Sequence, residues 1–258
     1  ARADGTGYLL CTDQRAGGSE VRVFRREGRP GDPHDHDEAL AVIAGGADAT
    51  DGLEATSAGE ASVAFAGGVV IAHPYPPHGA TMALPVVYRI AKSCRERHLA
   101  TLRFNFRGVE GSLGTFSGTE EHRDVAAAGE FLRGRLAGLD GDALPGPNTL
   151  PVALAGYSFG AWVNALGLAK FEEAQRLIMV SPPVSVIDFS FLEHSPKIKL
   201  VICGSRDEIA EYKKVEKMLP KWNDQALFKV IQGADHFYSG YEEELIDIAG
   251  EFLRKEKA

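Results

Sequence analysis

One serine carries the clearest chemical signal in the sequence. Ser158 is the centre of GYSFG at 156–160, between the apolar run LPVALAGY and the Ala- and Leu-rich run FGAWVNALGLA. A strand that turns at such a serine straight into a helix forms a nucleophile elbow, which lifts the hydroxyl clear of the sheet. Gly156 and Gly160 fit this tight turn, because larger side chains there would collide with strand and helix. The pattern predicts Ser158 as a nucleophile; the plainer alternative is a glycine-flanked turn.

Two further side chains could activate this serine, because a serine hydroxyl is a weak nucleophile without a base. His236, in GADHFYSG, follows the last expected strand, so its imidazole can reach the carboxyl edge of a parallel sheet. The segment KLVICGSRDE ends the preceding strand and supplies Asp207 to orient the base. Glu208 and Asp235 are alternatives, although Asp207 comes first after the Gly-Ser turn. The chain order Ser158, Asp207, His236 is the order associated with a nucleophile elbow.

Two backbone amides could hold the oxyanion that attack on a carbonyl creates. Phe159 begins the helix after the serine, so its N–H points toward developing negative charge. The second donor is expected in the loop after VVIAHP, where Tyr75 is the candidate because Pro74 and Pro76 have no N–H. His73, just before this loop, is interpreted as a structural, hydrogen-bonding histidine beneath the site in preference to a direct participant in catalysis.

Short apolar runs alternate with longer amphipathic ones from Val69 onward, which predicts strands joined by crossover helices in one mostly parallel, doubly wound α/β sheet. The expected strands are 69–74, 100–106, 150–157, 176–181, 199–204 and 227–233, and the expected helices lie near 85–98, 119–137, 159–171, 208–219 and 240–255. Between the fourth and fifth of these strands, residues 182–197 leave room for a short helix or loop and not for a large cap domain. The site is therefore expected to be open.

The N-terminal part has a different pattern. GYLLCT and SEVRVFRR predict an antiparallel pair of strands that leads into the main sheet. Residues 27–66 are rich in Gly, Ala and Asp, and they are interpreted as a surface insertion in a single domain that spans residues 1–258. Two alternatives stay open: the insertion folds over the site, or its EALAVIAGG run is a core strand.

Negative charge is concentrated in that segment. Between Gly31 and Gly68 there are eight of the 36 acidic residues and no Lys or Arg, so the rest of the chain is neutral. No basic surface of the kind that nucleic acids require is expected. His34 and His36 alternate with carboxylates in DPHDHDE, where a solvated acidic loop is favoured over a metal site. The proposed chemistry requires neither a metal nor an organic cofactor.

The glycine-rich segment RFNFRGVEGSLGTFSGTEEHRD follows an expected strand and contains two arginines. Arg103 and Arg107 could bind a substrate carboxylate. Such arginines more often brace loops through carboxylates such as Glu120 or Asp124. The bracing role is therefore preferred for both.

Three widely spaced cysteines, Cys11, Cys94 and Cys203, form no CxxC pair, which indicates structural thiols in a reducing compartment. No apolar stretch reaches the roughly 18 residues of a membrane span, and no secretory signal opens the chain. The expected location is the cytoplasm or the interior of an organelle, without secretion. Opening with Ala1 in place of methionine fits either a trimmed chain or the mature form of an organellar protein, and the oligomeric state stays open.

From about Val69 to the C-terminus, the sequence resembles a family of small, lidless α/β-hydrolases related to dienelactone hydrolases and short-chain esterases. The features that carry this resemblance are HPYP followed by GATM, RFNFRGVEGSLGTFSG, GYSFGAW, GSRDE and GADHF. Tyr75, Leu84 and Glu110 stand where that family usually has histidine, asparagine and glycine. The resemblance implies an α/β-hydrolase fold and hydrolase activity, and it implies no particular substrate.

Taken together, these residues predict a serine hydrolase that cleaves an ester, thioester or similar acyl bond through an acyl-enzyme intermediate. The expected partner is a small-molecule acyl substrate or an acylated peptide. One alternative is a binding or scaffold protein that keeps the fold without turnover. Another is a serine peptidase of the same architecture, which is disfavoured because no cap or propeller domain is expected to select peptides.

Overall fold

A nine-stranded sheet, in the order β1-β2-β3-β5-β4-β6-β7-β8-β9, forms the centre of the computed structural model. The structure describes the backbone of residues 10–13, 20–26 and 36–44, and residues 67–139 and 151–255 except 96, 98, 113, 172 and 173. The six parallel strands are β5 (Ala100–Phe104), β4 (Gly68–Ala72), β6 (Val152–Tyr157), β7 (Ala174–Val180), β8 (Ile198–Gly204) and β9 (Leu227–Ile231). The prediction of a mostly parallel α/β sheet is confirmed.

Three antiparallel strands extend one edge of this sheet. They are β1 (Leu10–Asp13), β2 (Glu20–Arg26) and β3 (His36–Ala44). β3 joins the pair β1–β2 to the parallel strands, because it also pairs antiparallel with β5, Ala41 opposite Phe104. The antiparallel lead-in was therefore expected correctly, although it contains one strand more than the sequence suggested.

The interpretation of residues 27–66 as a surface insertion is wrong for residues 36–44. These residues form β3 and occupy a position inside the sheet, so EALAVIAGG does contribute a strand. Alanine and acidic residues have low strand propensity, and the pairing partners on both sides of the strand override that local preference. The remainder of 27–66 lies outside the described residues, and its position relative to the site stays a prediction, as does the single domain over 1–258.

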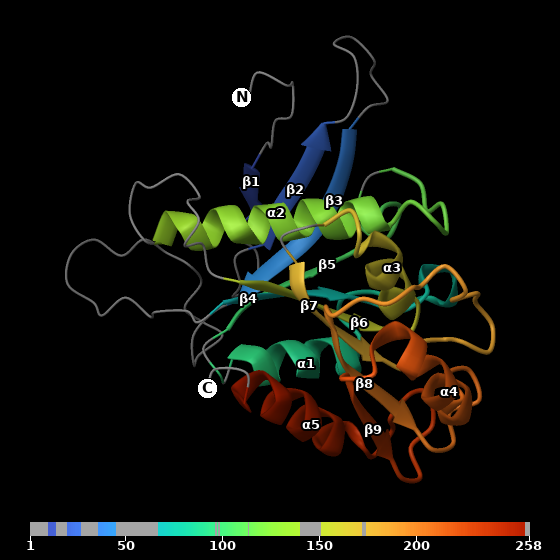
Figure 1. The fold of residues 1–258 in the computed structure, drawn as a ribbon. Helices are drawn as coiled ribbons and strands as arrows, with labels where there is room; N and C mark the ends of the chain where they lie inside the picture. The colour runs from blue at the N-terminus through green and yellow to red at the C-terminus, as the bar shows by residue number, and fades with distance from the viewer. Residues whose placement is uncertain are drawn as a thin grey trace.

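Helices cover both faces of the sheet (Figure 1). α1 (Pro85–Arg95) packs beside α5 (Glu242–Lys255) on one face, while α2 (His122–Leu139) packs beside α3 (Phe159–Gly167) on the other. α4 (Tyr212–Asn223) contacts β8 and contributes its buried side chains to the same core as α2 and α3. Because helices cover both faces, the central strands are near-continuous apolar runs, and every residue of β4 and β6 is buried.

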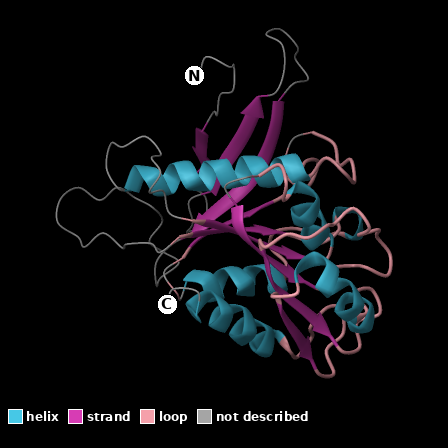
Figure 2. Ribbon diagram, in the orientation of Figure 1, coloured by secondary structure: helices cyan, strands magenta, loops and turns pink. Residues whose placement is uncertain are grey.

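The loops that follow the parallel strands share one edge of the sheet (Figure 2). In open parallel sheets, ligands bind at this carboxyl edge, because loops distant in sequence meet there. Residues 181–197, between β7 and β8, contain turns and no helix, so no cap domain lies between these two strands. None of the described helices is long and apolar enough to cross a membrane.

Candidate active site

Ser158 occupies a sharp turn between β6 and α3. Its backbone angles are φ 55° and ψ −119°, a conformation that costs a residue with a side chain about 1–3 kcal/mol. A Cβ atom on Gly156 would overlap the Gly160 carbonyl group, and one on Gly160 would overlap the carbonyl group of Ala72. Although Ser158 is the N-cap of α3, its hydroxyl caps no amide of the helix. The elbow therefore needs both glycines, and it leaves the serine hydroxyl available for another partner.

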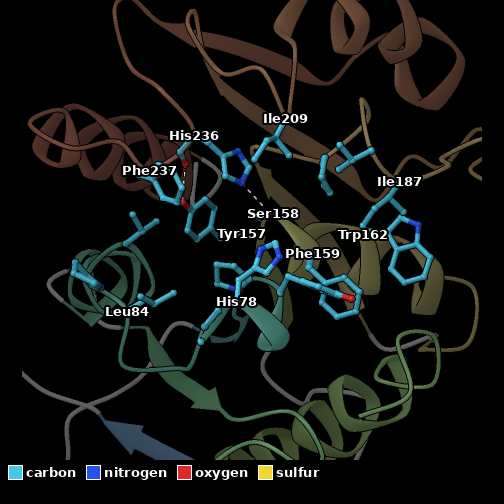
Figure 3. Close-up of a pocket in the computed structure, with 18 of the residues that line it drawn as sticks. His78, Leu84, Tyr157, Ser158, Phe159, Trp162, Ile187, Ile209, His236 and Phe237 are labelled. Atoms are coloured by element: carbon cyan, nitrogen blue, oxygen red, sulfur yellow. Dashed lines mark hydrogen bonds between the residues drawn. The ribbon is translucent and has the colours of Figure 1, made fainter.

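That partner is His236, which in turn contacts Asp207 (Figure 3). Ser158 Oγ lies 2.9 Å from His236 Nε2, and His236 Nδ1 lies 2.9 and 3.0 Å from the two carboxylate oxygens of Asp207. Because an ionised carboxylate only accepts hydrogen bonds, Nδ1 carries the proton and donates it, and Nε2 accepts from the serine hydroxyl. The structure thus brings together three side chains that are 29 and 78 residues apart along the chain.

The Asp207 carboxylate is held in place by several donors. Its Oδ1 accepts the backbone N–H groups of Ile209 at 3.0 Å and Ala210 at 2.7 Å. Burial acts to raise the pKa of this carboxyl group. The hydrogen bond and charge of His236, the Ala210 amide and the Ser181 hydroxyl together outweigh burial and lower the pKa of Asp207. The side chain is therefore ionised at neutral pH, as a partner of an imidazolium must be.

Three residues that the sequence analysis did not single out support this arrangement. The Tyr157 hydroxyl donates to the backbone carbonyl of His236 at 2.6 Å, which ties the serine elbow to the histidine loop. Behind the acid, the Ser181 hydroxyl lies 2.7 Å from the Tyr238 hydroxyl. Ser158, Ser181 and Tyr238 all have positive φ, with values of 55°, 46° and 57°. Strained non-glycine residues cluster at functional sites, but no sequence pattern marks Ser181 or Tyr238.

The two amides predicted as oxyanion donors border the same pocket as Ser158. Phe159 is the first residue of α3, so its N–H has no acceptor within the helix. The Tyr75 N–H has no acceptor among the described residues, and the Tyr75 ring packs edge-on against Phe159 with ring centroids 5.3 Å apart. Both amides are thus free to donate, and their role as an oxyanion hole stays a prediction.

Comparisons with known proteins agree with this fold. No protein-family model matches the chain. An uncharacterized protein of Rickettsia prowazekii (strain Madrid E) is 31% identical over 193 residues, which cover 71% of this chain and 77% of that protein. An α/β serine hydrolase without a lid from Xanthomonas campestris is 25% identical over 97% of this chain and 94% of that chain, with a TM-score of 0.69. The chain belongs to the α/β-hydrolase superfamily.

A second solved structure gives the same result. An α/β serine hydrolase homologue from Coxiella burnetii is 28% identical over 84% of this chain and 92% of that chain, with a TM-score of 0.69. The resemblance expected from the sequence motifs is therefore confirmed at the level of the superfamily.

An apolar pocket of about 800 Å³ opens beside the serine of this α/β hydrolase. Its walls come from the loop after β4, the start of α1, α3, the β7–β8 loop and the loop between β9 and α5. Apolar side chains dominate the lining, among them Leu84, Trp162, Ile187 and Phe237 (Figure 3). Such a pocket next to a hydrogen-bonded serine and histidine can hold the carbon chain of an acyl substrate.

His73 lies at the end of β4 and is fully buried. Its Nδ1 donates to the Pro74 carbonyl at 2.7 Å, and its Nε2 accepts the Phe106 N–H at 3.1 Å. Burial lowers the pKa of His73 to about 4, although the Pro74 hydrogen bond opposes the shift. Both ring nitrogens therefore serve the backbone, which agrees with a structural role.

The two arginines have different partners, and neither lines the pocket beside Ser158. Arg107 and Asp124 form a buried ion pair, with Nη2 2.6 Å from Oδ1, so the predicted brace is present there. Arg103 instead donates to the Met82 carbonyl at 2.8 Å and lies over the Tyr88 ring. The expectation that Glu120 or Asp124 engages an arginine of this segment therefore holds for Arg107.

The competitors of Asp207 point elsewhere. Glu208 is exposed, and Asp235 accepts the N–H of Phe237 within its own loop at 2.9 Å.

The described residues contain no group of three potential metal ligands. The side chains of His34 and His36 lie outside the described part of the chain. Cys94 and Cys203 are both buried, and burial raises the pKa of the Cys203 thiol, so this thiol is protonated at neutral pH.

Proposed function

We propose that this α/β hydrolase is a serine hydrolase that cleaves an ester, thioester or similar acyl bond. One observation carries the proposal: Ser158, His236 and Asp207 form a continuous hydrogen-bonded chain that ends at the wall of an apolar pocket. A purely structural hydrogen bond would not require a strained backbone at the serine. The strain at Ser158 accompanies a hydroxyl that donates to the acceptor nitrogen of a buried histidine, as nucleophilic catalysis requires.

In the proposed reaction, His236 Nε2 removes the Ser158 proton as the oxygen attacks the substrate carbonyl carbon. The Asp207 carboxylate stabilises the imidazolium that forms. The amides of Phe159 and Tyr75 donate to the oxyanion, and His236 then protonates the leaving group. Water, activated by the same His236, hydrolyses the acyl-enzyme and restores the serine.

The pocket favours a small acyl substrate. Residues 181–197 place no cap over this part of the edge, which favours entry of a substrate from solvent on this side. An acylated peptide could present its acyl group in the same way. The protein requires no metal for this chemistry, because the serine, the base and the amide donors supply each step.

The test is covalent labelling combined with turnover. We expect a fluorophosphonate probe to label Ser158, as peptide mass spectrometry can check, and we expect p-nitrophenyl esters of short to medium chain length to be hydrolysed. Ser158→Ala should abolish labelling and reduce the rate by about 10^4 to 10^6, with an unchanged circular dichroism spectrum. Retention of more than a few per cent of the rate in Ser158→Ala would contradict the nucleophile assignment. A correctly folded wild type that neither reacts nor turns over would favour a binding role.

A further inference from the structure

We infer that the pocket distinguishes substrates by charge, accepting an ester that carries a cationic group at its α5 side and disfavouring a carboxylate. The inference rests on the proposed function and names a substrate class for it. It starts from the charge of the pocket wall. Among the described residues that line the pocket, Glu242 is the only one that is an aspartate, glutamate, lysine or arginine. The other titratable lining groups are the imidazoles of His78 and His236 and the phenols of Tyr75 and Tyr157.

The described lining residues include no arginine or lysine that could bind a substrate carboxylate. Arg107 is paired with Asp124, and Arg103 is directed at the Met82 carbonyl and the Tyr88 ring. An anionic substrate entering the pocket would therefore lose hydration without gaining an ion pair, and it would also meet the Glu242 carboxylate. The described wall thus disfavours negative charge.

Glu242 is placed to interact with a ligand. It is the first residue of α5, and its Oε2 accepts the Gly240 N–H at 2.8 Å, which fixes the side chain. Its Oε1 has no hydrogen-bond partner among the described residues. The side chain is partly exposed and lines the pocket, so a ligand can reach it.

The pocket has two different sides (Figure 3). Phe237 and Leu84 lie on one side of Ser158, whereas Trp162 and Ile187 lie on the other. The Trp162 indole N–H donates to the Asp188 carbonyl at 3.0 Å, so the second side offers an apolar ring with no free donor. Glu242 begins α5, and the next residue, Glu243, forms an ion pair with Arg89 of α1. Leu84 immediately precedes α1, so Glu242 lies toward the first side. The second side suits an uncharged hydrocarbon chain.

An aromatic ring and a carboxylate together suit a quaternary or protonated amine. Phe237 lines the pocket and is 67% exposed, so its side chain is accessible to a ligand. The face of an aromatic ring attracts cations, and a carboxylate adds a charge interaction that salt screens. From the two contributions we expect a preference of about three- to tenfold for a cation over a neutral group of equal shape.

The experiment compares choline butyrate with 3,3-dimethylbutyl butyrate, which replaces the ammonium nitrogen with carbon and keeps the shape. Glu242 has the one Asp, Glu, Lys or Arg side chain of the described wall, so the comparison tests the charge of the leaving group against its carboxylate. We expect wild type to have a several-fold higher kcat/KM for the choline ester at low salt, and a smaller ratio at high salt. Glu242→Gln should lower the ratio to the smaller value that the Phe237 ring alone supports. Glu244→Gln changes an exposed carboxylate in the same helical turn that does not line the pocket, and it should keep the wild-type ratio.

A second measurement needs no variant. Choline should inhibit wild-type hydrolysis of p-nitrophenyl butyrate at a several-fold lower concentration than 3,3-dimethylbutanol does. Equal kcat/KM values for the two esters, or a ratio that Glu242→Gln leaves unchanged, would overturn the charge selectivity while the hydrolase function stands. Failure to hydrolyse either ester, together with no fluorophosphonate labelling of Ser158, would instead overturn the proposed function and with it this inference.

Discussion

Two buried histidines lie at the same edge of the sheet and do different things. His73 follows β4 and His236 follows β9, and they are 0% and 8% exposed. Each uses both ring nitrogens in hydrogen bonds. His73 has only backbone partners, whereas the partners of His236 are the side chains of Asp207 and Ser158.

This difference in partners decides what each imidazole can do. A proton arriving at His73 would have to break the hydrogen bond from the Phe106 N–H, in a buried site where the described residues supply no counter-charge. Burial lowers the pKa of His73 to about 4. A proton arriving at His236 would meet the ionised Asp207 carboxylate. A buried histidine can therefore act as a base where a carboxylate accompanies it, and it is locked neutral where only the backbone does.

The largest expected effect comes from removing that carboxylate. Asp207→Asn should lower kcat by about 10^4, because an amide can donate to Nδ1 and favour the wrong imidazole tautomer. Glu208→Gln changes an exposed neighbour and should have little effect on kcat. Ester hydrolysis by the purified variants gives the ranking. The reverse ranking would transfer the orienting role to Glu208 and remove the contrast between the two histidines.

An intermediate effect is expected on stability at His73. The pKa of this residue falls from 6.5 to about 4 on folding, so its neutral form stabilises the native state fully above about pH 6.5. That contribution, about 3 kcal/mol, is lost as the pH falls from 6.5 to 4. His73→Gln should therefore destabilise the protein most at pH 7.5, and the difference from wild type should shrink towards pH 4.

Urea unfolding at several pH values measures this difference. His194→Gln is the matched control, because His194 is exposed in the loop between β7 and β8. A constant difference between wild type and His73→Gln across this pH range would show that His73 has an ordinary pKa and is not locked neutral.

The smallest expected effect concerns the Ser181 hydroxyl, which contacts Tyr238 and helps to lower the pKa of Asp207. Ser181→Ala and Ser181→Gly both remove it, and each should lower kcat about tenfold with little change in KM, as expected for one hydrogen bond to a charged group. Glycine accepts the φ of 46° without strain, so Ser181→Gly should unfold at a higher urea concentration than Ser181→Ala. Wild-type kcat in both variants would show that the Ser181 hydroxyl does not help to position Asp207.

The local pattern of the sequence was sufficient for much of this molecule. Apolar runs and glycine turns located the parallel strands to within a few residues, and they placed Ser158, Asp207 and His236 after three different strands. Parallel strands carry their carboxyl ends to one edge, so residues at those ends meet whatever their separation in sequence. The helix expected from residue 208 begins at Tyr212, because the Asp207 carboxylate holds the amides of Ile209 and Ala210 in a loop.

Other features were decided by tertiary structure alone. Residues 36–44 become a strand because β2 and β5 offer hydrogen-bonding edges on both sides, which outweigh the low strand propensity of an alanine-rich run. Tyr157, Ser181 and Tyr238 support the site through contacts that join separate strands and loops. The sequence thus determined which chemical groups reach the edge of the sheet, because strand and turn preferences act locally. Which groups touch there, and which pKa values shift, depends on burial and on partners that only the folded chain brings together.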